Sequence, residues 1–539
     1  MRTPIRRTGQ NSTPQAVDAV SGPRERPKWV GSATHRQPAS DFCQEAHARC
    51  VIVSNRLPVC RRRCEDGSET YGRASGGLVT ALSRVLSTHG GTWVGWLGGR
   101  EDEHGPTATA PPNGSEAYEL ASVELDSLDV EQYYDGFSNG LVWPLFHDVL
   151  GACRFEADDW EGYQRVNRKF AIGVCRASEP GDMVWVHDYH LMLVGAYVRE
   201  TRPEANLSFF LHIPFPPPDV FLKLPWRKPV IDALLAYDLV GFQTPADLQN
   251  FQDCVAALFP ETIWTESEGL CVAHRQKRYL GAGVFPISVD VADFIKRASR
   301  PEVGALAREL RPALGRQLVL GIDRLDYTKG IPQRIEAFGN ALERYPELRQ
   351  RVTLLQVVVP SRTDVKAYRE LKDEIDRMVG RVNGAYGRPG WTPIEYMYRG
   401  LDDRELLAYY RAADIALVTP LKDGMNLVAK EFCVCCLDDE GVLILSEFAG
   451  AATQLGDLAL LVNPFDTRAM ADAIRSAVTM NRDRRRAVMR RLRHRVADGD
   501  VMQWARAFIA AAHRFTPAVG GANGPQGLAV CPSATSALG

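Results

Sequence analysis

The chain has 539 residues, of which 45% are hydrophobic and 24% charged, and its formal net charge is −2 at pH 7. At about 150 residues per domain, this length predicts three to four domains or two larger ones. The near-zero net charge excludes a strong field that would draw the chain to nucleic acid or lipid. No apolar run predicts a transmembrane helix or a secretory signal, so we expect a cytoplasmic protein with no membrane or nucleic-acid partner.

The 12 cysteines are too few to predict a disulfide scaffold in so long a chain. Their close groupings, 60/64 and 433–436, have no histidine at the spacing of a zinc site. The second grouping lies in an apolar run, where small buried side chains are the natural interpretation. We therefore expect no metal and no cofactor.

Two polar ends flank one long region with the pattern of an α/β protein. Residues 1–49 and 515–539 are poor in large apolar side chains, and we expect both to be disordered tails. Between them, apolar runs alternate with helical patterns, which predicts parallel βαβ units. The expected strands are 51–54, 183–187, 208–212, 239–243, 318–322, 353–359, 415–419, 442–446 and 459–462. A break near residue 295 predicts two lobes, 50–295 and 296–514, with a terminal helix that packs back onto a lobe.

Charged side chains gather where the expected strands end. The residues in such positions include Arg56, Asp188, His212, Arg324, Lys329, Arg362 and Asp423. Ligands of open parallel sheets bind beyond the carboxyl ends of the strands, so we expect these side chains to lie around one cleft. Guanidinium groups hold phosphate through a planar fork, which indicates an anionic ligand.

Two glycine-containing turns precede helical patterns and fit a phosphate as well. Gly76 and Gly77 open one pattern, and the turn at Asp423 leads into another that begins near Leu427. The N–H groups of such a helix start can bind a diphosphate, and Glu431, about one turn further, can accept hydrogen bonds from sugar or ribose hydroxyls. The glycine fingerprints of dinucleotide and P-loop sites are absent, which disfavours an NAD-linked enzyme. The residues thus indicate two Rossmann-like lobes that hold at least two phosphate-bearing ligands.

Seven runs of the sequence resemble the trehalose-phosphate synthase family of retaining glycosyltransferases. They are 53–58 (VSNRLP), 75–78 (SGGL), 139–147 (NGLVWPLFH), 185–191 (WVHDYHL), 211–216 (LHIPFP), 323–330 (DRLDYTKG) and 423–431 (DGMNLVAKE). The resemblance implies a GT-B fold, in which the parallel sheets of two Rossmann-like lobes face a central cleft. It implies a hexosyltransferase that moves glucose from an NDP-glucose, expected to be UDP-glucose, to glucose 6-phosphate. The products would be α,α-trehalose 6-phosphate and NDP, formed with retention and without a metal.

The resemblance also implies roles for individual residues. The acceptor binders are Arg56, Tyr134, Asp188 and Arg362. The donor binders are Gly76, Gly77, Arg324, Lys329, Leu427, Val428, Ala429, Lys430 and Glu431. Trp143 shapes the sugar site, and the catalytic set is Arg324, Lys329, His212 and Asp423. For Lys430 we expect the backbone to contribute, with its ammonium at the surface.

Other conspicuous residues have structural interpretations. They are Asp326, which we expect to cap its own loop, and His190, Trp93 and Trp96, which we expect in the core. The basic run 482–495 has the spacing of a solvated amphipathic helix. Two alternative functions remain open: transfer to another phosphorylated acceptor such as glycerol phosphate, and a catalytically silent protein that senses glucose 6-phosphate. The nucleotide base and a homo-oligomeric state are also left open.

Overall fold

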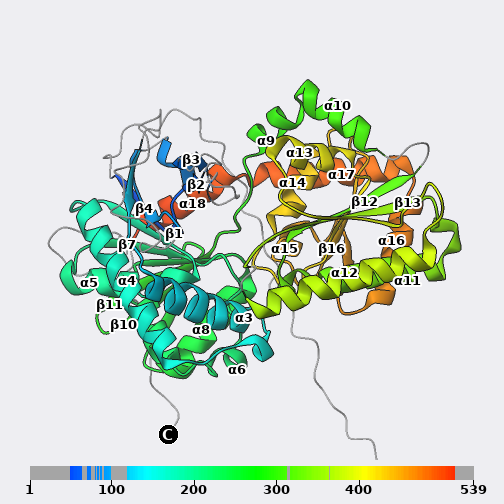
Figure 1. Cartoon of the computed structure of the whole chain (residues 1–539). Coiled ribbons are helices and arrows are strands. Elements are labelled where there is room, and N and C mark those ends of the chain that lie inside the picture. The colour runs from blue at the N-terminus through cyan, green and yellow to red at the C-terminus, as the bar shows by residue number, and fades with distance from the viewer. Residues whose placement is uncertain are drawn as a thin grey trace, which may run out of the picture. The chain divides into compact units, whose positions relative to one another are not determined.

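The computed structural model describes residues 49–63, 69–73, 79, 82–83, 85–87, 90–98, 118–311, 316–362 and 365–515 (Figure 1). Gly76 and Gly77 lie outside the described residues, as do the expected tails apart from residues 49 and 515. No helix in the described part of the chain is both long and apolar enough to cross a membrane.

The N-terminal lobe is built on a nine-stranded sheet with the order β5-β4-β1-β6-β7-β8-β11-β10-β9. Its strands are β1 (Cys50–Arg56), β4 (Gly91–Trp96), β5 (Glu119–Ser122), β6 (Met183–His187), β7 (Asn206–Phe210), β8 (Leu239–Phe242), β9 (Ile263–Ser267), β10 (Leu270–Arg275) and β11 (Arg278–Val284). Neighbours from β5 to β11 are parallel, whereas β10 is antiparallel to β9 and β11. A separate antiparallel pair consists of β2 (Val59–Arg63) and β3 (Glu69–Arg73).

Both faces of this sheet are covered, as its continuous apolar strands predict. Alternate residues of β1 enter different cores: Val51 and Val53 join the core of α4 (Ala157–Ala177), and Ile52 joins the core of the terminal helix α18 (Val501–His513). The other α-helices of the lobe are α2 (Ser127–Asp129), α3 (Trp143–Phe146), α5 (Val194–Thr201), α6 (Pro218–Phe221), α7 (Arg227–Leu234) and α8 (Pro245–Leu258).

A π-helix of 13 residues, η3 (Val130–Val142), leads into α3. π-Helical segments are rare and often occur at functional sites. The Tyr133 hydroxyl of this segment donates to Asn55 Oδ1 at 2.9 Å, next to the last residue of β1. The π-helix therefore brings Tyr134 to the carboxyl end of the first sheet.

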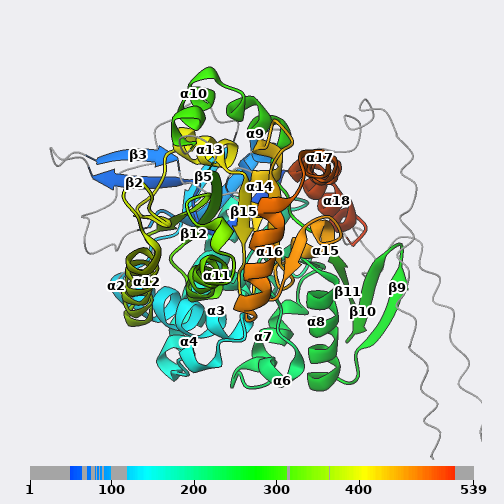
Figure 2. The ribbon, with the colours of Figure 1, turned by 90° about the vertical axis from the view of Figure 1, so that its right-hand side faces the viewer.

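The C-terminal lobe is built on six parallel strands with the order β14-β13-β12-β15-β16-β17. They are β12 (Gln317–Arg324), β13 (Val352–Val359), β14 (Ile394–Tyr398), β15 (Ile415–Val418), β16 (Val442–Ser446) and β17 (Leu460–Val462). One face shares a core with α11 (Ile331–Arg344), α12 (Lys366–Tyr386) and α16 (Thr467–Thr479), of which α11 and α16 lie side by side (Figure 2). The other face packs with α9 (Val291–Ala298), α10 (Pro301–Leu310), α13 (Asp403–Ala412), α14 (Leu427–Cys435), α15 (Ala452–Leu455) and α17 (Arg482–Asp498).

The last two helices lead the chain from the second lobe to the first. The basic helix α17 buries Met489, Leu492 and Val496. Its arginines reach acidic partners, for example Arg493 to Asp439 at 2.6 Å, which confirms the amphipathic helix. In α18, the Phe508 ring stacks on Trp185 at 4.5 Å between centroids. The terminal helix therefore packs onto the first sheet.

All nine expected strands are present, with ends shifted by up to two residues. The strands that the pattern missed are short, glycine-containing or at the edges: β2 to β5, β9 to β11 and β14. At the far edge of the first sheet, where the pattern predicted no strand, tight hairpins make β9, β10 and β11 antiparallel. The boundary near residue 295 and the two tails stay predictions.

Candidate active site

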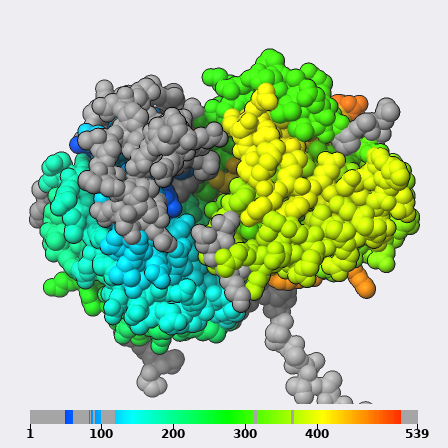
Figure 3. Space-filling model, viewed as in Figure 1, coloured from blue at the N-terminus to red at the C-terminus, as the bar shows by residue number. Residues whose placement is uncertain are grey.

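The carboxyl ends of strands from both sheets supply the predicted site residues. Arg56 ends β1, Asp188 follows β6, and Arg324 ends β12. Figure 3 shows the surfaces of the two lobes adjoining each other, with the cyan segment that contains η3 and α3 next to the yellow segment that contains α12.

On the N-terminal lobe, aromatic rings hold the cation of Arg56. Its guanidinium carbon lies 3.9 Å from the centre of the Trp96 ring and 5.4 Å from that of Tyr134. Tyr134 in turn stacks on His190, with 5.9 Å between ring centres. Trp96 and His190 are buried, as expected for core residues, and Trp96 also forms the floor beneath Arg56. The rings thereby orient the cation, and among the residues that the structure describes no carboxylate pairs with it.

Arg362 of the C-terminal lobe reaches the same aromatic cluster. Its Nη2 donates to the Tyr189 hydroxyl at 3.4 Å, and its guanidinium carbon lies 4.8 Å from the centre of the Trp143 ring. On its own lobe, Nη1 donates to the Tyr368 hydroxyl at 2.5 Å. Tyr189 belongs to the other lobe and packs against His190, on which Tyr134 stacks, so Arg362 joins its own lobe to the aromatic cluster beside Arg56.

Asp326 holds the loop after β12 in place. Its Oδ1 accepts from the Thr328 backbone N–H at 3.0 Å, which confirms the expected loop cap. Its Oδ2 also lies 3.8 Å from Arg362 Nη1. The carboxylate therefore stabilises both the loop that carries Lys329 and the neighbouring arginine.

Lys329 and Asp423 form an ion pair, with 2.5 Å between Nζ and Oδ2. Burial by itself raises the pKa of Asp423, but the charge and hydrogen bond of Lys329, together with the backbone N–H of Met425, hold the pKa below its ordinary range. Asn426 Nδ2 donates to the same carboxylate at 3.2 Å. Arg324, at the exposed end of β12, makes no side-chain hydrogen bond or ion pair with another described residue. Among the described residues, Lys329 is thus a paired cation and Arg324 an unpaired one.

Asp188 stands between the lobes in a strained conformation, with φ at 75°. Its Oδ1 accepts from the His212 backbone N–H at 3.2 Å. Burial raises the pKa of Asp188 from 3.8 to about 6, while Arg324 of the second lobe acts in the opposite direction. A raised pKa at a strand end is typical of a functional carboxylate.

The imidazole of His212 is held by protein partners at both nitrogens. Gln243 Nε2 lies 3.3 Å from Nδ1, and His187 Nδ1 lies 3.1 Å from Nε2. An amide nitrogen can only donate, so Nδ1 accepts and Nε2 carries the proton. Burial lowers the pKa of His212 to about 3, which keeps the ring neutral. The catalytic role of His212 stays a prediction. Because both ring nitrogens already have protein partners, His212 offers the site the edge of its ring and its backbone.

The backbone of Gly424 packs closely against that of His212 in the other lobe. A Cβ atom on Gly424 would lie 2.2 Å from the His212 carbonyl oxygen, so only glycine fits. The turn then enters α14, whose first residues Leu427 and Val428 are partly buried. The start of the helix therefore faces the strand end that carries His212.

The expectation that the Lys430 ammonium lies at the surface was wrong. The residue is 1% exposed, and its Nζ donates to the Ile287 carbonyl at 2.6 Å. The next residue, Glu431, accepts from the Tyr410 hydroxyl at 2.7 Å. Helical spacing correctly placed Lys430 and Glu431 on different sides of α14. The side that carries Lys430 is not at the surface, because the segment that connects the lobes covers it.

Sequence reasoning assigned no role to two residues that the structure places in the site. Tyr189 joins Arg362 to Asn139, whose Oδ1 accepts from its hydroxyl at 2.8 Å. His147 donates from Nδ1 to the Trp143 carbonyl at 2.7 Å, and burial lowers its pKa to about 4. Both lie in the runs that carry the resemblance, and their spacing from Asp188 and Trp143 was the available signal.

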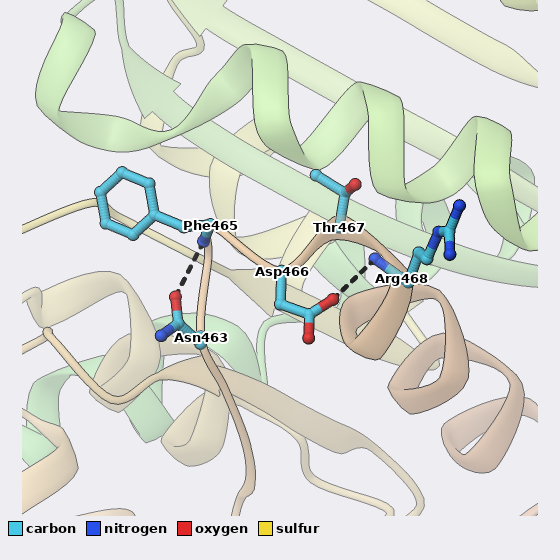
Figure 4. Close-up of a pocket in the computed structure, with 5 residues that line it drawn as sticks. All are labelled: Asn463, Phe465, Asp466, Thr467 and Arg468. Atoms are coloured by element: carbon cyan, nitrogen blue, oxygen red, sulfur yellow. Dashed lines mark hydrogen bonds between the residues drawn. The ribbon is translucent and has the colours of Figure 1, made fainter. Parts of the chain in front are cut away.

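A pocket at the start of α16 is separate from these residues (Figure 4). It is lined by Asn463, Phe465, Asp466, Thr467 and Arg468. Asp466 caps α16 by accepting from the backbone N–H groups of Arg468 and Ala469. The pocket therefore has a local structural explanation and includes none of the predicted site residues.

The sequence of the chain matches glycosyltransferase family 20 over residues 48–514. The chain belongs to this family. A trehalose-6-phosphate synthase of Mycolicibacterium gilvum (strain PYR-GCK) is 41% identical over 485 residues, which cover 89% of this chain and 96% of that protein. The family membership makes the chain a glycosyltransferase.

Two solved structures at more than 30% identity show the same fold. An α,α-trehalose-phosphate synthase (UDP-forming) from Burkholderia xenovorans, in complex with glucose-6-phosphate, has a TM-score of 0.79 at 35% identity and covers 86% of this chain and 100% of that chain. A protein from E. coli bound with UDP-2-fluoro glucose has a TM-score of 0.79 at 34% identity and covers 87% of this chain and 100% of that chain. The GT-B fold expected from the resemblance is confirmed.

Proposed function

We propose that this family 20 glycosyltransferase moves glucose from UDP-glucose to glucose 6-phosphate with retention, giving α,α-trehalose 6-phosphate and UDP. The name of the M. gilvum relative supports the reaction. The ligands of the related structures, glucose-6-phosphate and a fluorinated UDP-glucose, support the two substrates. The observation in this chain that carries the proposal is the 3.4 Å contact of Arg362 with Tyr189, which joins Arg362 to the lobe that carries Arg56.

The acceptor has a site at the meeting of the two lobes. Arg56 and Arg362 would bind its phosphate, since both guanidinium groups are fixed against aromatic rings. Tyr134 and Asp188 would bind its hydroxyls, and Trp143 would pack against the sugars. Two fixed cations on one phosphate orient the acceptor hydroxyl toward the donor, which is a proximity effect.

The donor has its site on the second lobe. Arg324, Lys329 and the backbone of 427–429 would bind the diphosphate, together with Gly76 and Gly77. The carboxylate of Glu431 would accept from the nucleotide ribose, and Asp423 would accept from the glucose hydroxyls. Because α14 begins at Leu427, its first N–H groups lack partners within the helix and suit an anion.

The cations of the second lobe explain how the reaction is accelerated. Departure of the nucleotide places new negative charge on its diphosphate and positive charge on the anomeric carbon. Arg324 and Lys329 would stabilise the diphosphate more strongly as this charge grows, which lowers the barrier. The acceptor hydroxyl would then attack the anomeric carbon from the face that the diphosphate leaves, guided by an oxygen of that diphosphate. The configuration of the anomeric carbon would therefore be retained.

Nucleotide release is the direct test of this reaction. UDP-, GDP- and ADP-glucose are each incubated with the enzyme, with and without glucose 6-phosphate, and NDP is measured. The proposal predicts release that needs the acceptor and is fastest from UDP-glucose. Equal release without acceptor would indicate hydrolysis, and release with glycerol phosphate instead would indicate the other acceptor class. Binding of glucose 6-phosphate without release from any donor would indicate a silent sensor. The cytoplasmic location stays part of the proposal.

A further inference from the structure

The backbone of Ile287 is held by both lobes. Ile287 lies between β11 of the first sheet and α9, on the segment that leads into the second lobe. Its N–H donates to Gln243 Oε1 at 2.9 Å, and Gln243 directly follows β8 of the first sheet. Its carbonyl accepts from Lys430 Nζ at 2.6 Å, and Lys430 lies in α14 of the second lobe. A single residue of the connecting segment is therefore fixed on one side by each lobe.

The burial of Lys430 requires an explanation, because lysine is rarely buried without a charged partner. The side chain is 1% exposed, and the Ile287 carbonyl is its one hydrogen-bond partner among the described residues. Burial lowers the pKa of Lys430 to about 7, as expected for an ammonium that has no carboxylate nearby. An apolar side chain would fill this position at a lower desolvation cost, so the hydrogen bond to Ile287 is the distinctive contribution of Lys430.

The same hydrogen-bond series continues into the sugar site. Gln243 is 1% exposed, and while its Oε1 accepts from Ile287, its Nε2 donates to His212 Nδ1 at 3.3 Å. His212 then donates from Nε2 to His187 Nδ1 at 3.1 Å. We call this series, His187–His212–Gln243–Ile287–Lys430, the hinge relay. It connects His212 at the predicted glucose site to α14 at the predicted diphosphate site.

We propose that Lys430 is a positioning residue, which uses the hinge relay to hold the start of α14 in register with His212. This inference rests on the proposed function, because it assigns the diphosphate and the glucose of one donor to the two ends of the relay. Its physical basis is that a donor bridging two lobes binds well only when both ends are at the right separation. Pre-organisation of that separation lowers the cost of binding and of reaching the transition state.

Three variants test the relay. Lys430→Met keeps the length of the side chain but cannot donate, Lys430→Arg restores a donor, and Gln243→Met removes both side-chain bonds at the other end. Breaking the relay at either end is expected to lower kcat/KM for the donor about tenfold, in Lys430→Met and in Gln243→Met alike. Lys430→Arg is expected to recover at least part of that loss. KM for glucose 6-phosphate is expected to stay within about twofold in all three.

The double variant distinguishes positioning from a local structural role. If the two residues act through one relay, Lys430→Met in the Gln243→Met background lowers kcat/KM little further, and the total loss stays near tenfold. If each residue only stabilises its own surroundings, the losses multiply to about a hundredfold, and the inference is wrong. The matched control is Lys422→Met, which removes a lysine just before α14 that pairs with Asp148 at 2.5 Å outside the relay. Thermal unfolding of each variant verifies that it is folded.

Nucleotide affinity separates failure of this inference from failure of the proposed function. Calorimetry with UDP alone requires no turnover and reports on the α14 end of the relay. A wild-type enzyme that binds UDP but never releases it from UDP-glucose would contradict the proposed function, and the relay would still be tested by weaker UDP binding in Lys430→Met. An active wild type with an unaffected Lys430→Met would overturn the relay alone.

Discussion

Replacement of Lys329 by methionine tests whether this ammonium stabilises the leaving diphosphate. The Nζ atom lies 2.5 Å from Asp423 Oδ2, and the two side chains are only 12% and 15% exposed. When the glycosidic bond to the nucleotide breaks, the diphosphate gains one negative charge. Lys329→Met removes the cation while keeping the apolar stem, so its effect measures the interaction with that new charge.

The low exposure of the pair sets the size of the expected effect. Two unit charges about 4 Å apart interact by about 4 kcal/mol at an effective dielectric constant of about 20, compared with about 1 kcal/mol in water. The Lys329 side chain is only 12% exposed, so the larger energy, that for a dielectric constant of about 20, applies to it. Because about 1.4 kcal/mol corresponds to a tenfold change in rate, Lys329→Met is expected to lower kcat by about a thousandfold.

The assay is NDP release from UDP-glucose at saturating glucose 6-phosphate. Lys422→Met is the matched control, because Lys422 lies beside Asp423 in sequence but pairs with Asp148, which is 45% exposed. Exposed pairs contribute about 0–1 kcal/mol, so kcat of the control is expected to change less than about fivefold. Thermal unfolding checks that both variants fold. A folded Lys329→Met enzyme whose kcat lies within about fivefold of wild type would refute the reasoning. A change of that size corresponds to about 1 kcal/mol, which is the interaction of two charges screened by water.

Three further changes probe the acceptor site and the contact between the lobes. Because burial raises the pKa of Asp188 from 3.8 to about 6, kcat/KM for the acceptor should fall as pH drops below about 6, whereas folding stability should rise on the same acidification, since the folded state binds the proton more tightly. Asp188→Asn should remove the stability trend and should leave in kcat/KM only the acid limb that comes from titration of the acceptor phosphate, whose second pKa is about 6; unchanged profiles would contradict the shift. Arg362→Met should raise KM for glucose 6-phosphate at least tenfold and leave KM for UDP-glucose within about twofold, measured by steady-state kinetics; the reverse pattern would assign Arg362 to the donor. Gly424→Ala should lower kcat at least tenfold, because its Cβ would lie 2.2 Å from the His212 carbonyl oxygen, whereas Gly400→Ala, with nothing within 4 Å of its Cβ, should have no effect; equal effects would show that the contact is unimportant.

The order of elements and the residues at strand ends could be predicted from the sequence alone. Long β-branched runs such as that of β13 bury both faces of a parallel strand, and this pattern is local. The charged residue that follows such a run lies at the carboxyl edge by necessity, which is why the pattern of apolar runs was enough to identify Arg56, Arg324 and Asp423. The short runs resembling a known family then indicated the reaction.

Only the tertiary structure decided which of these side chains meet, because contacts between the lobes join residues far apart in the chain. Arg362 and Tyr189 are 173 positions apart, yet their side chains make a hydrogen bond. Lys430 looked like a surface charge, since helical periodicity gives the direction of a side chain but not what a distant segment places over it. The antiparallel edge at β9 to β11 and the π-helix before Trp143 were hidden for a related reason, because pairing and helical pitch there depend on packing more than on local propensity.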